Sequence, residues 1–257
     1  MATVAALPDE QLVEMLGLMK GADSVELKAT VPFNEHSHPG AKLGVDPLEA
    51  QIRQVYFFDT PSLTLNRNGV VVRARRVQRK KGGDSIVKIR PVVPSQLPDE
   101  LRHSADFNVE VDAMPGGFVC SGTLKRRLEN AEVRSATQGD RSVRSLFSKA
   151  QRALVAEHGP DDIELDELEV LGPILVLKLR FEPEGYRRPL VVELWTYPDN
   201  SRVLELSTKC PPDEAFQVAA ESRAFLAGRG VDLAGEQQTK TLKALKACVK
   251  GTKPAVG

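Results

Sequence analysis

Charged residues in this chain recur two positions apart, in stretches whose intervening residues are mostly Val, Ile, Leu, Phe or Ala. Successive side chains on a β-strand point to opposite faces, so each stretch is predicted to be a strand with one charged and one apolar face. At least seven stretches show this pattern, and few folds accommodate so many strands of this kind. The charged residues are Glu26 and Lys28, Arg73 and Arg75, Lys88 and Arg90, Glu110 and Asp112, Lys178 and Arg180, and the late acids Glu193 and Glu205.

Period-two alternation predicts about nine strands, separated by turn signals such as Gly82-Gly83. The predicted strands are 24–31, 54–58, 69–76, 84–91, 107–113, 146–156, 174–181, 190–197 and 202–209. Helical spacing predicts helices at 8–20, 212–226 and 236–249. Many strands with few helices between them favour an antiparallel sheet or barrel over a doubly wound fold. We therefore expect an α+β protein that is mainly antiparallel β.

The chain is expected to form a single domain over residues 1–257, with its core at 24–245. No internal repeat, low-complexity tract or change in composition marks a linker. A length of 257 residues suits one elaborate barrel. In 114–144, turn signals and charges alternate without a clear period, so we expect an insertion between two strands there.

The charged strand faces allow two interpretations. The solvated face of an ordinary antiparallel sheet also alternates with apolar residues. Such a face normally includes Thr, Ser, Gln and Asn, whereas paired cations and paired carboxylates dominate here. A closed barrel of about eight strands turns this face inward and leaves space for one small ligand. We expect a closed barrel of eight or nine strands whose charged side chains converge on one axis.

An inward ring of Arg and Lys needs anions, because an unpaired charge removed from water is costly. Arg suits phosphate in particular, since its planar guanidinium binds two oxygens at once. The carboxylates among the cations fit Mg²⁺ or Mn²⁺, which take oxygen ligands from carboxylates, water and phosphate. A network of mutually neutralising ion pairs is the alternative.

Because the formal net charge of the chain is zero, any anion-binding site must come from cations that gather in one place. Lys plus Arg and Asp plus Glu both number 35, so no net field attracts nucleic acid or an anionic membrane. No apolar stretch approaches the roughly 18 residues of a membrane span, and residues 1–10 lack a signal-peptide pattern. We expect a cytoplasmic protein that binds neither nucleic acid nor membrane. The three scattered cysteines, Cys120, Cys210 and Cys248, suit reduced thiols.

Three other features are expected to be structural. His36 and His38 lie in a Pro- and Gly-containing loop without further ligands at zinc spacing. The basic run 75–81 lacks the aromatic residues that stack on nucleic-acid bases. Trp195 shares a strand face with Glu193, and we expect it to pack at the barrel mouth, with stacking on a substrate ring as the alternative.

Several short motifs occur along the chain in an order that is also found in a known superfamily. They are Ser24-Val25-Glu26-Leu27-Lys28, Phe57-Phe58-Asp59-Thr60-Pro61, Arg73-Ala74-Arg75, Ser85 to Arg90, Val109 to Asp112 and Val203 to Ser207. They resemble the E-x-E-x-K, Y-F-D-T, L-R-x-R, T-L-K, acidic-strand and E-x-E segments of the CYTH superfamily of triphosphate tunnel enzymes. This superfamily includes class IV adenylyl cyclases, thiamine triphosphatases and inorganic tripolyphosphatases. The resemblance spans 24–245 and includes Thr239-Lys240 near its end.

The resemblance implies an eight-stranded tunnel that binds a triphosphate together with Mg²⁺ or Mn²⁺. It assigns phosphate binding to Arg73, Arg75, Lys88, Arg90, Lys149, Arg152, Lys178 and Arg180. Lys149 and Arg152 represent a later basic strand in this alignment. It assigns metal binding to Glu26, Glu193 and Glu205, and catalytic roles to Lys28, Glu110 and Asp112.

Two positions depart from the family pattern. Ser24 and Ser207 stand where the motifs have Glu, and each change removes one negative charge. We expect a divalent-metal-dependent hydrolase of inorganic tripolyphosphate, thiamine triphosphate or a nucleoside triphosphate. Two alternatives stay open: an adenylyl cyclase, and a non-catalytic module that binds a triphosphate or polyphosphate. The sequence also leaves a homodimer open.

Overall fold

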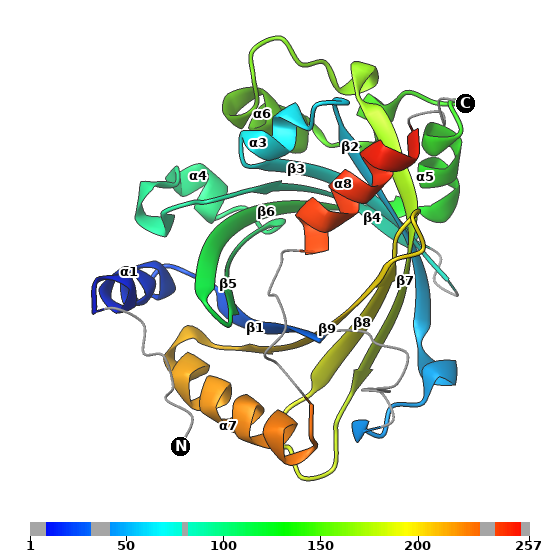
Figure 1. Ribbon diagram of the computed structural model, residues 1–257. Helices are drawn as coiled ribbons and strands as arrows, with labels where there is room; N and C mark the ends of the chain where they lie inside the picture. The colour runs from blue at the N-terminus through cyan, green and yellow to red at the C-terminus, as the bar shows by residue number, and fades with distance from the viewer. Residues whose placement is uncertain (1–8, 32–41, 79–81, 232–239, 253–257) are drawn as a thin grey trace.

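The computed structural model describes residues 9–31, 42–78, 82–231 and 240–252. Within them, nine strands close into one barrel in the order β1-β5-β6-β4-β3-β2-β7-β8-β9 (Figure 1). The strands are β1 (Ser24–Val31), β2 (Gln51–Asp59), β3 (Val70–Val77), β4 (Gly82–Ile89), β5 (Phe107–Met114), β6 (Gly117–Glu129), β7 (Glu169–Phe181), β8 (Leu190–Thr196) and β9 (Arg202–Cys210). Neighbouring strands run antiparallel except β1 and β5, which are parallel. The expected α+β barrel is confirmed.

Helices surround the barrel (Figure 1). They are α1 (Asp9–Met19), α3 (Thr64–Arg67), α4 (Asp99–Arg102), α5 (Asn130–Thr137), α6 (Lys149–His158), α7 (Ala215–Gly228) and α8 (Lys240–Thr252). Short 3₁₀ turns are η1 (Pro47–Glu49), η2 (Pro94–Gln96), η3 (Val143–Leu146), η4 (Leu165–Glu167) and η5 (Pro212–Glu214). The helices predicted at 8–20 and 212–226 are confirmed as α1 and as η5 with α7. The helix predicted at 236–249 matches α8 from Lys240 onward, and 236–239 lies outside the described residues.

The hydrophobic core lies between the outer face of the barrel and these helices. Val133 of α5 and Leu154 of α6 pack with strand residues such as Val72 and Val87 in one apolar cluster. Leu226 of α7 packs in a second cluster with residues of β8 and β9, including Leu206. The apolar strand face therefore points outward, and the charged face is left to point inward.

Helix α8 closes one end of the barrel. Its buried residues Ala244 and Leu245 share a cluster with Val55, Val71 and Val176, which line the inside of the barrel. Lys240, the first residue of α8, lies at the cavity wall. The helix thus caps the interior and brings one further cation to it.

The structure corrects two sequence predictions. Residues 146–156 form the end of η3 and most of α6, not a strand, because Ser148 and Gln151 make a capping box that starts a helix. The stretch 114–144 contains β6, a barrel strand between β5 and β4, rather than an insertion. The predicted number of about nine strands is nevertheless correct, because the unpredicted strand β6 replaces the wrongly predicted strand 146–156 in the count.

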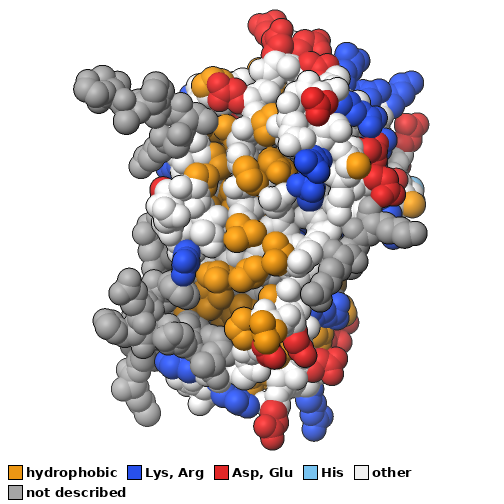
Figure 2. Space-filling view, turned by 90° about the vertical axis from the view of Figure 1, so that its right-hand side faces the viewer, with side chains coloured by type: hydrophobic (Ala, Val, Ile, Leu, Met, Phe, Trp, Pro, Cys, Tyr) orange, Lys and Arg blue, Asp and Glu red, His pale blue; other side chains and the backbone are white. Residues whose placement is uncertain are grey.

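The side of the molecule on which β2 and β7 lie shows apolar side chains at its centre (Figure 2). Ile52 of β2 and Leu175 of β7 are 38% and 43% exposed. None of the described helices is long and apolar enough to span a membrane. All three cysteines lie in the described part of the chain, where they are buried and form no disulfide. The predicted loop with His36 and His38, and residues 79–81 of the basic run, lie outside the described residues.

Candidate functional site

The barrel encloses a cavity of about 880 Å³ whose wall includes side chains from all nine strands and from α8. Among the described residues that line it, twelve are Lys or Arg and six are Asp or Glu. Cations therefore outnumber carboxylates two to one in a chain whose formal net charge is zero. A volume of this size is typical of a site for a small-molecule ligand.

The cavity brings together most of the side chains predicted to form the site. The residues that line it are Glu26, Lys28, Arg73, Arg75, Lys88, Arg90, Glu110, Asp112, Lys178, Arg180, Glu193 and Glu205. Lys149 and Arg152 are not among the lining residues, because they lie on α6 at the outer side of the barrel. Arg152 Nη1 donates instead to the backbone oxygen of Phe147 at 2.7 Å.

The sequence analysis did not identify five of the cations that line the cavity: Arg53, Lys125, Arg127, Lys209 and Lys240. Lys125 and Arg127 belong to β6, the strand that was not predicted, although they also stand two residues apart. Arg53 precedes the predicted start of its strand by one residue, and Lys209 ends a predicted strand on the same face as Glu205. Extending the predicted strand 54–58 by one residue would have reached Arg53, and following the period-two pattern to the last residue of 202–209 would have identified Lys209.

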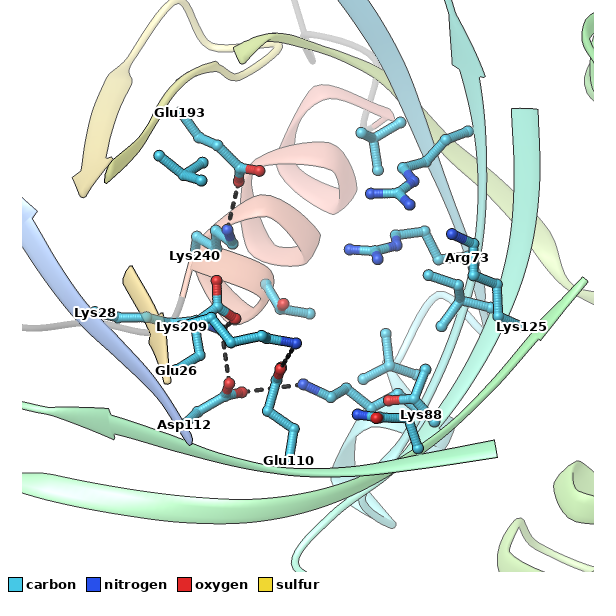
Figure 3. A pocket seen from close by; sticks show the side chains of 18 of the residues that line it. Glu26, Lys28, Arg73, Lys88, Glu110, Asp112, Lys125, Glu193, Lys209 and Lys240 are labelled. Atoms are coloured by element: carbon cyan, nitrogen blue, oxygen red, sulfur yellow. Dashed lines mark hydrogen bonds and ion pairs between the residues drawn. The ribbon is translucent and has the colours of Figure 1, made fainter. Parts of the chain in front are cut away.

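Three carboxylates converge on one side of the cavity (Figure 3). One oxygen from each of Glu26, Glu110 and Asp112 lies within 4.8 Å of the other two. The parallel pairing of β1 with β5 produces this cluster, because it places Glu26 opposite Asp112 and Ser24 opposite Glu110. The hydroxyl of Ser24 donates to Glu110 Oε2 at 3.3 Å. The serine that replaces an acid of the family motif is thus a hydrogen-bond partner of the cluster.

Lysines surround this acidic cluster and keep two of its members ionised. Lys28 Nζ lies 3.0 Å from Glu26 Oε2 and donates to Asp112 Oδ1 at 2.8 Å, and Lys88 Nζ donates to Asp112 Oδ2 at 3.0 Å. Burial alone would raise the pKa of Glu26, but Lys28 and Lys240 outweigh it and lower the pKa to about 2. Burial is likewise outweighed at Asp112, where Lys28 and Lys88 lower the pKa.

Glu110 behaves differently from the other two carboxyls. Burial and repulsion from the two neighbouring carboxylates raise its pKa above the ordinary value. An ion pair with Lys209 offsets this only in part. Placing a third negative charge in the cluster is therefore costly without a further cation.

The acidic cluster offers the oxygen ligands that a hard divalent cation requires. Such ions take several oxygen ligands, and three carboxylates converge here. The hydroxyl of Ser121, which is fully buried, has no hydrogen-bond partner within the described structure. Ser121 lies directly opposite Glu110 on β6, and side chains at paired positions share one face of a sheet. The donor set therefore fits Mg²⁺ or Mn²⁺.

The other two predicted metal ligands, Glu193 and Glu205, accept hydrogen bonds from lysines. Glu193 and Glu205 face each other across β8 and β9. Lys240 Nζ donates to Glu193 Oε2 at 2.6 Å and also to Glu205, and Lys178 Nζ donates to Glu193 Oε1 at 2.7 Å (Figure 3). Burial disfavours ionised Glu193, but Lys240 and Lys178 lower its pKa well below the ordinary value. Glu193 thus resembles Asp112, because each of its two carboxylate oxygens accepts a hydrogen bond from a lysine.

Arginines dominate the opposite side of the cavity, where Figure 3 shows Arg73 and Lys125 far from the labelled acids. The Nε atom of Arg73 is buried without a hydrogen-bond partner in the described structure. Burial and repulsion from Arg75 lower the pKa of Arg73 to about 10. Burial and Arg75 also lower the pKa of Arg53. This side of the cavity therefore carries positive charges that repel one another, and an anion would offset this repulsion.

Trp195 lines the cavity and is held by the residues beside it. Its Nε1 donates to Glu193 Oε2 at 3.0 Å, and its ring centroid lies 5.0 Å from Lys240 Nζ. The side chain is buried in the cluster formed with α8. The expected packing role at the end of the barrel is confirmed.

Two solved structures have the same fold. A proposed adenylate cyclase from Bacillus halodurans matches with a TM-score of 0.59 at 12% identity, covering 86% of this chain and 97% of that one. HpAC1 from Hippeastrum, a proposed adenylyl cyclase described as having a dominant triphosphatase activity, matches with a TM-score of 0.58 at 18% identity, covering 83% and 91%. No family model and no curated protein sequence matches the chain. The tunnel fold expected from the CYTH resemblance is confirmed.

Proposed function

We propose that the protein is a divalent-metal-dependent hydrolase of a triphosphate compound: inorganic tripolyphosphate, thiamine triphosphate or a nucleoside triphosphate. The observation that carries this proposal is the division of one closed cavity into a carboxylate cluster and an arginine-rich side. A phosphate chain that carries a metal ion at one end matches both sides at once. The triphosphatase activity described for HpAC1, which has the same fold, supports the choice of reaction.

The phosphate chain would bind along the basic side. Arg73 offers a guanidinium whose Nε has no partner, and Lys88 and Lys178 extend the cationic surface on either side. Charge-assisted hydrogen bonds to phosphate are about twice as strong as neutral ones, and a closed barrel shields them from water. Binding would also relieve the repulsion that lowers the pKa of Arg73.

Glu26, Glu110 and Asp112 would hold Mg²⁺ or Mn²⁺, with Ser121 beside them. When bound, such an ion neutralises phosphate oxygens and lowers the pKa of a bound water. Lys28 and Lys88 fix the orientation of the Asp112 carboxylate, and Lys209 does so for Glu110. In the reaction, a water oxygen bonds to the terminal phosphorus while the bond to the bridging oxygen breaks, giving orthophosphate and a diphosphate compound. The protein contributes mainly alignment and charge.

A phosphate-binding module without turnover is the second candidate, and Ser24 and Ser207 favour it. Ser207 lies opposite Lys28 across β9 and β1, where a carboxylate would add a charge near the cluster. With serine at both positions, the cluster keeps three carboxylates. The adenylyl cyclase alternative needs a site for a nucleoside, and Trp195 is already engaged with Glu193 and Lys240.

One assay panel tests these candidates. The purified protein is incubated with tripolyphosphate, thiamine triphosphate or ATP, with Mg²⁺, with Mn²⁺ or with a chelator. Orthophosphate, pyrophosphate and cyclic AMP are then measured. We expect metal-dependent release of orthophosphate from at least one substrate. Lys149→Ala, on α6 outside the cavity, serves as a control that keeps full activity.

The other outcomes separate the alternatives. Cyclic AMP with equimolar pyrophosphate from ATP would identify a cyclase. Tight binding of tripolyphosphate without turnover of any substrate would leave the binding module. Absence of both binding and turnover would refute the proposed function.

A further inference from the structure

One carboxylate, Asp84, lies behind the arginine-rich side of the cavity, on the same strand face as two arginines that line it but not itself among the lining residues. Asp84 on β4 is buried, with 6% of its surface exposed. It lies directly opposite Arg75 on β3 and Arg127 on β6. Because cross-strand partners share one face, Asp84 belongs to the same inward face as these two arginines.

Asp84 engages the guanidinium of Arg75 with both of its oxygens. Arg75 Nε donates to Oδ1 at 2.7 Å, and Arg75 Nη2 donates to Oδ2 at 2.5 Å. Lys125 Nζ lies 3.5 Å from Oδ2. This two-point pairing uses the same geometry by which arginine binds phosphate.

Arg73 and Arg75 therefore differ although they stand two residues apart on one strand face. The Nε atom of Arg73 has no partner in the described structure, while the Nε of Arg75 is satisfied by Asp84. A phosphate at Arg73 gains contacts with an unsatisfied donor. A phosphate at Arg75 must compete with a carboxylate that already holds it, and the two anions repel each other.

We propose that Asp84 is a specificity-determining residue that limits the length of the phosphate chain by keeping Arg75 out of the phosphate-binding surface. This inference rests on the proposed function. It narrows the substrate class to compounds with three phosphates, in preference to longer phosphate chains. An additional phosphate beyond Arg73 would approach Asp84. Without the negative charge of Asp84, Arg75 is free to bind that phosphate, with Arg127 and Lys125 beside it.

The test compares the binding of tripolyphosphate and tetrapolyphosphate by isothermal titration calorimetry, with a chelator present so that no turnover occurs. The wild-type protein is expected to bind tetrapolyphosphate no more tightly than tripolyphosphate. Asp84→Asn is expected to shift the ratio of the two affinities toward tetrapolyphosphate by about tenfold, the effect of one additional charge-assisted contact. The double variant Asp84→Asn with Arg75→Met should return the ratio to the wild-type value.

Asp106→Asn is the matched control, because Asp106 is an aspartate that lines the cavity and the change removes the same charge. It should alter both affinities by a similar factor and leave their ratio unchanged. A purely structural role of the Asp84 pair would weaken the binding of both ligands alike in Asp84→Asn.

The failures of the two proposals are distinguishable. If the wild-type protein binds neither polyphosphate, the proposed function is wrong. If it binds tripolyphosphate but the ratio does not change in Asp84→Asn, the role of Asp84 is wrong. A wild-type preference of tenfold or more for tetrapolyphosphate also refutes that role, and this measurement needs no variant.

Discussion

Arg73 carries an electrostatic cost that a bound anion would offset. The side chain is partly buried beside Arg75, and its Nε is buried and unpaired in the described structure. A buried charge without a partner opposes folding, so it is retained only where another requirement outweighs stability. Residues of this kind indicate binding sites more directly than well-paired charges do.

Arg73→Met is therefore expected to have opposite effects on binding and stability. Loss of the guanidinium should weaken tripolyphosphate binding by about 10- to 100-fold, the range for hydrogen bonds to a charged group. It should also raise the free energy of unfolding by about 1 kcal/mol or more, because a buried unpaired cation is replaced by an apolar side chain. Calorimetric titration and urea denaturation measure the two effects. Unchanged tripolyphosphate affinity would show that the arginine-rich side is not the phosphate site.

Glu193 shows the reverse behaviour, since its ionised form is stabilised by Lys240 and Lys178. A carboxyl whose pKa is lower in the folded state stabilises the protein above its unfolded pKa and loses this contribution as the pH falls toward its folded pKa. Glu193→Gln should therefore lower the free energy of unfolding by about 3 kcal/mol at pH 7. The difference from the wild-type protein should shrink steadily below about pH 4.5.

Urea denaturation at several pH values tests this dependence. Glu164→Gln is the control, because Glu164 is exposed and its nearest arginine contact is 4.0 Å long. That variant should match the wild-type protein at every pH. A Glu193→Gln deficit that stays constant down to pH 3 would show that ion pairing is not its cause.

At the level of secondary structure, the sequence predicted most strands because their inward residues are charged and their outward residues are apolar. It missed β6, in which Gly117, Gly122 and the run Lys125-Arg126-Arg127 interrupt the alternation. Gly122 is required there, because a Cβ atom would lie 2.6 Å from the ring of Phe107. Close packing between neighbouring strands is a tertiary property that a single strand does not encode.

Residues 146–156 were misassigned for a related reason. Leu146, Leu154 and Val155 suit either a strand or a helix, and a short apolar run does not distinguish the two. The deciding signal was local: the Ser148 hydroxyl accepts from the Gln151 backbone N–H at 3.2 Å, and Gln151 Oε1 accepts from the Ser148 backbone N–H at 2.9 Å. The resemblance placed Lys149 and Arg152 in the site because it treated this helix as a strand.

Gln151 is expected to anchor α6 to the barrel. It is 1% exposed, and its Nε2 donates to the backbone oxygens of Ser85 at 3.2 Å and Leu124 at 3.1 Å. Gln151→Leu should lower the free energy of unfolding by about 1–3 kcal/mol, because these buried acceptors lose their partner. Tripolyphosphate affinity should stay unchanged, because Gln151 lies outside the cavity.

Urea denaturation and calorimetric titration check both parts of this prediction. Gln217→Leu, at an exposed position of α7, is the control and should change stability by less than about 0.5 kcal/mol. A large loss of ligand binding in Gln151→Leu would indicate that α6 positions the cavity wall.

At the level of the whole molecule, a chain of zero formal charge places twelve of its 35 Lys and Arg residues at the cavity wall, against six Asp and Glu. Sequence composition indicated that an anion site would be local, and the alternation indicated that it would be internal. The separation of the acids into a cluster of three and a pair bridged by Lys240 could not be predicted, because it depends on which strands are neighbours. Glu26 and Asp112 meet only through the parallel pairing of β1 and β5.

A polyanion should stabilise this protein markedly. Tripolyphosphate at about 100 times its dissociation constant, with a chelator present, should add about 2.7 kcal/mol to the free energy of unfolding. This corresponds to a rise of about 5 to 10 °C in melting temperature for a domain of this size. Differential scanning fluorimetry measures the shift. Sulfate at matched ionic strength should produce a much smaller one, and an equal shift would indicate general screening rather than a site.

The position of β1 between β5 and β9 has a consequence for synthesis. The first strand finds one neighbour in the middle of the chain and the other near its end, so the barrel closes only after β9 has emerged from the ribosome. Lys240 arrives later still, at the start of α8. A partly synthesised chain therefore cannot assemble the complete cavity, which forms only once translation has passed the start of α8.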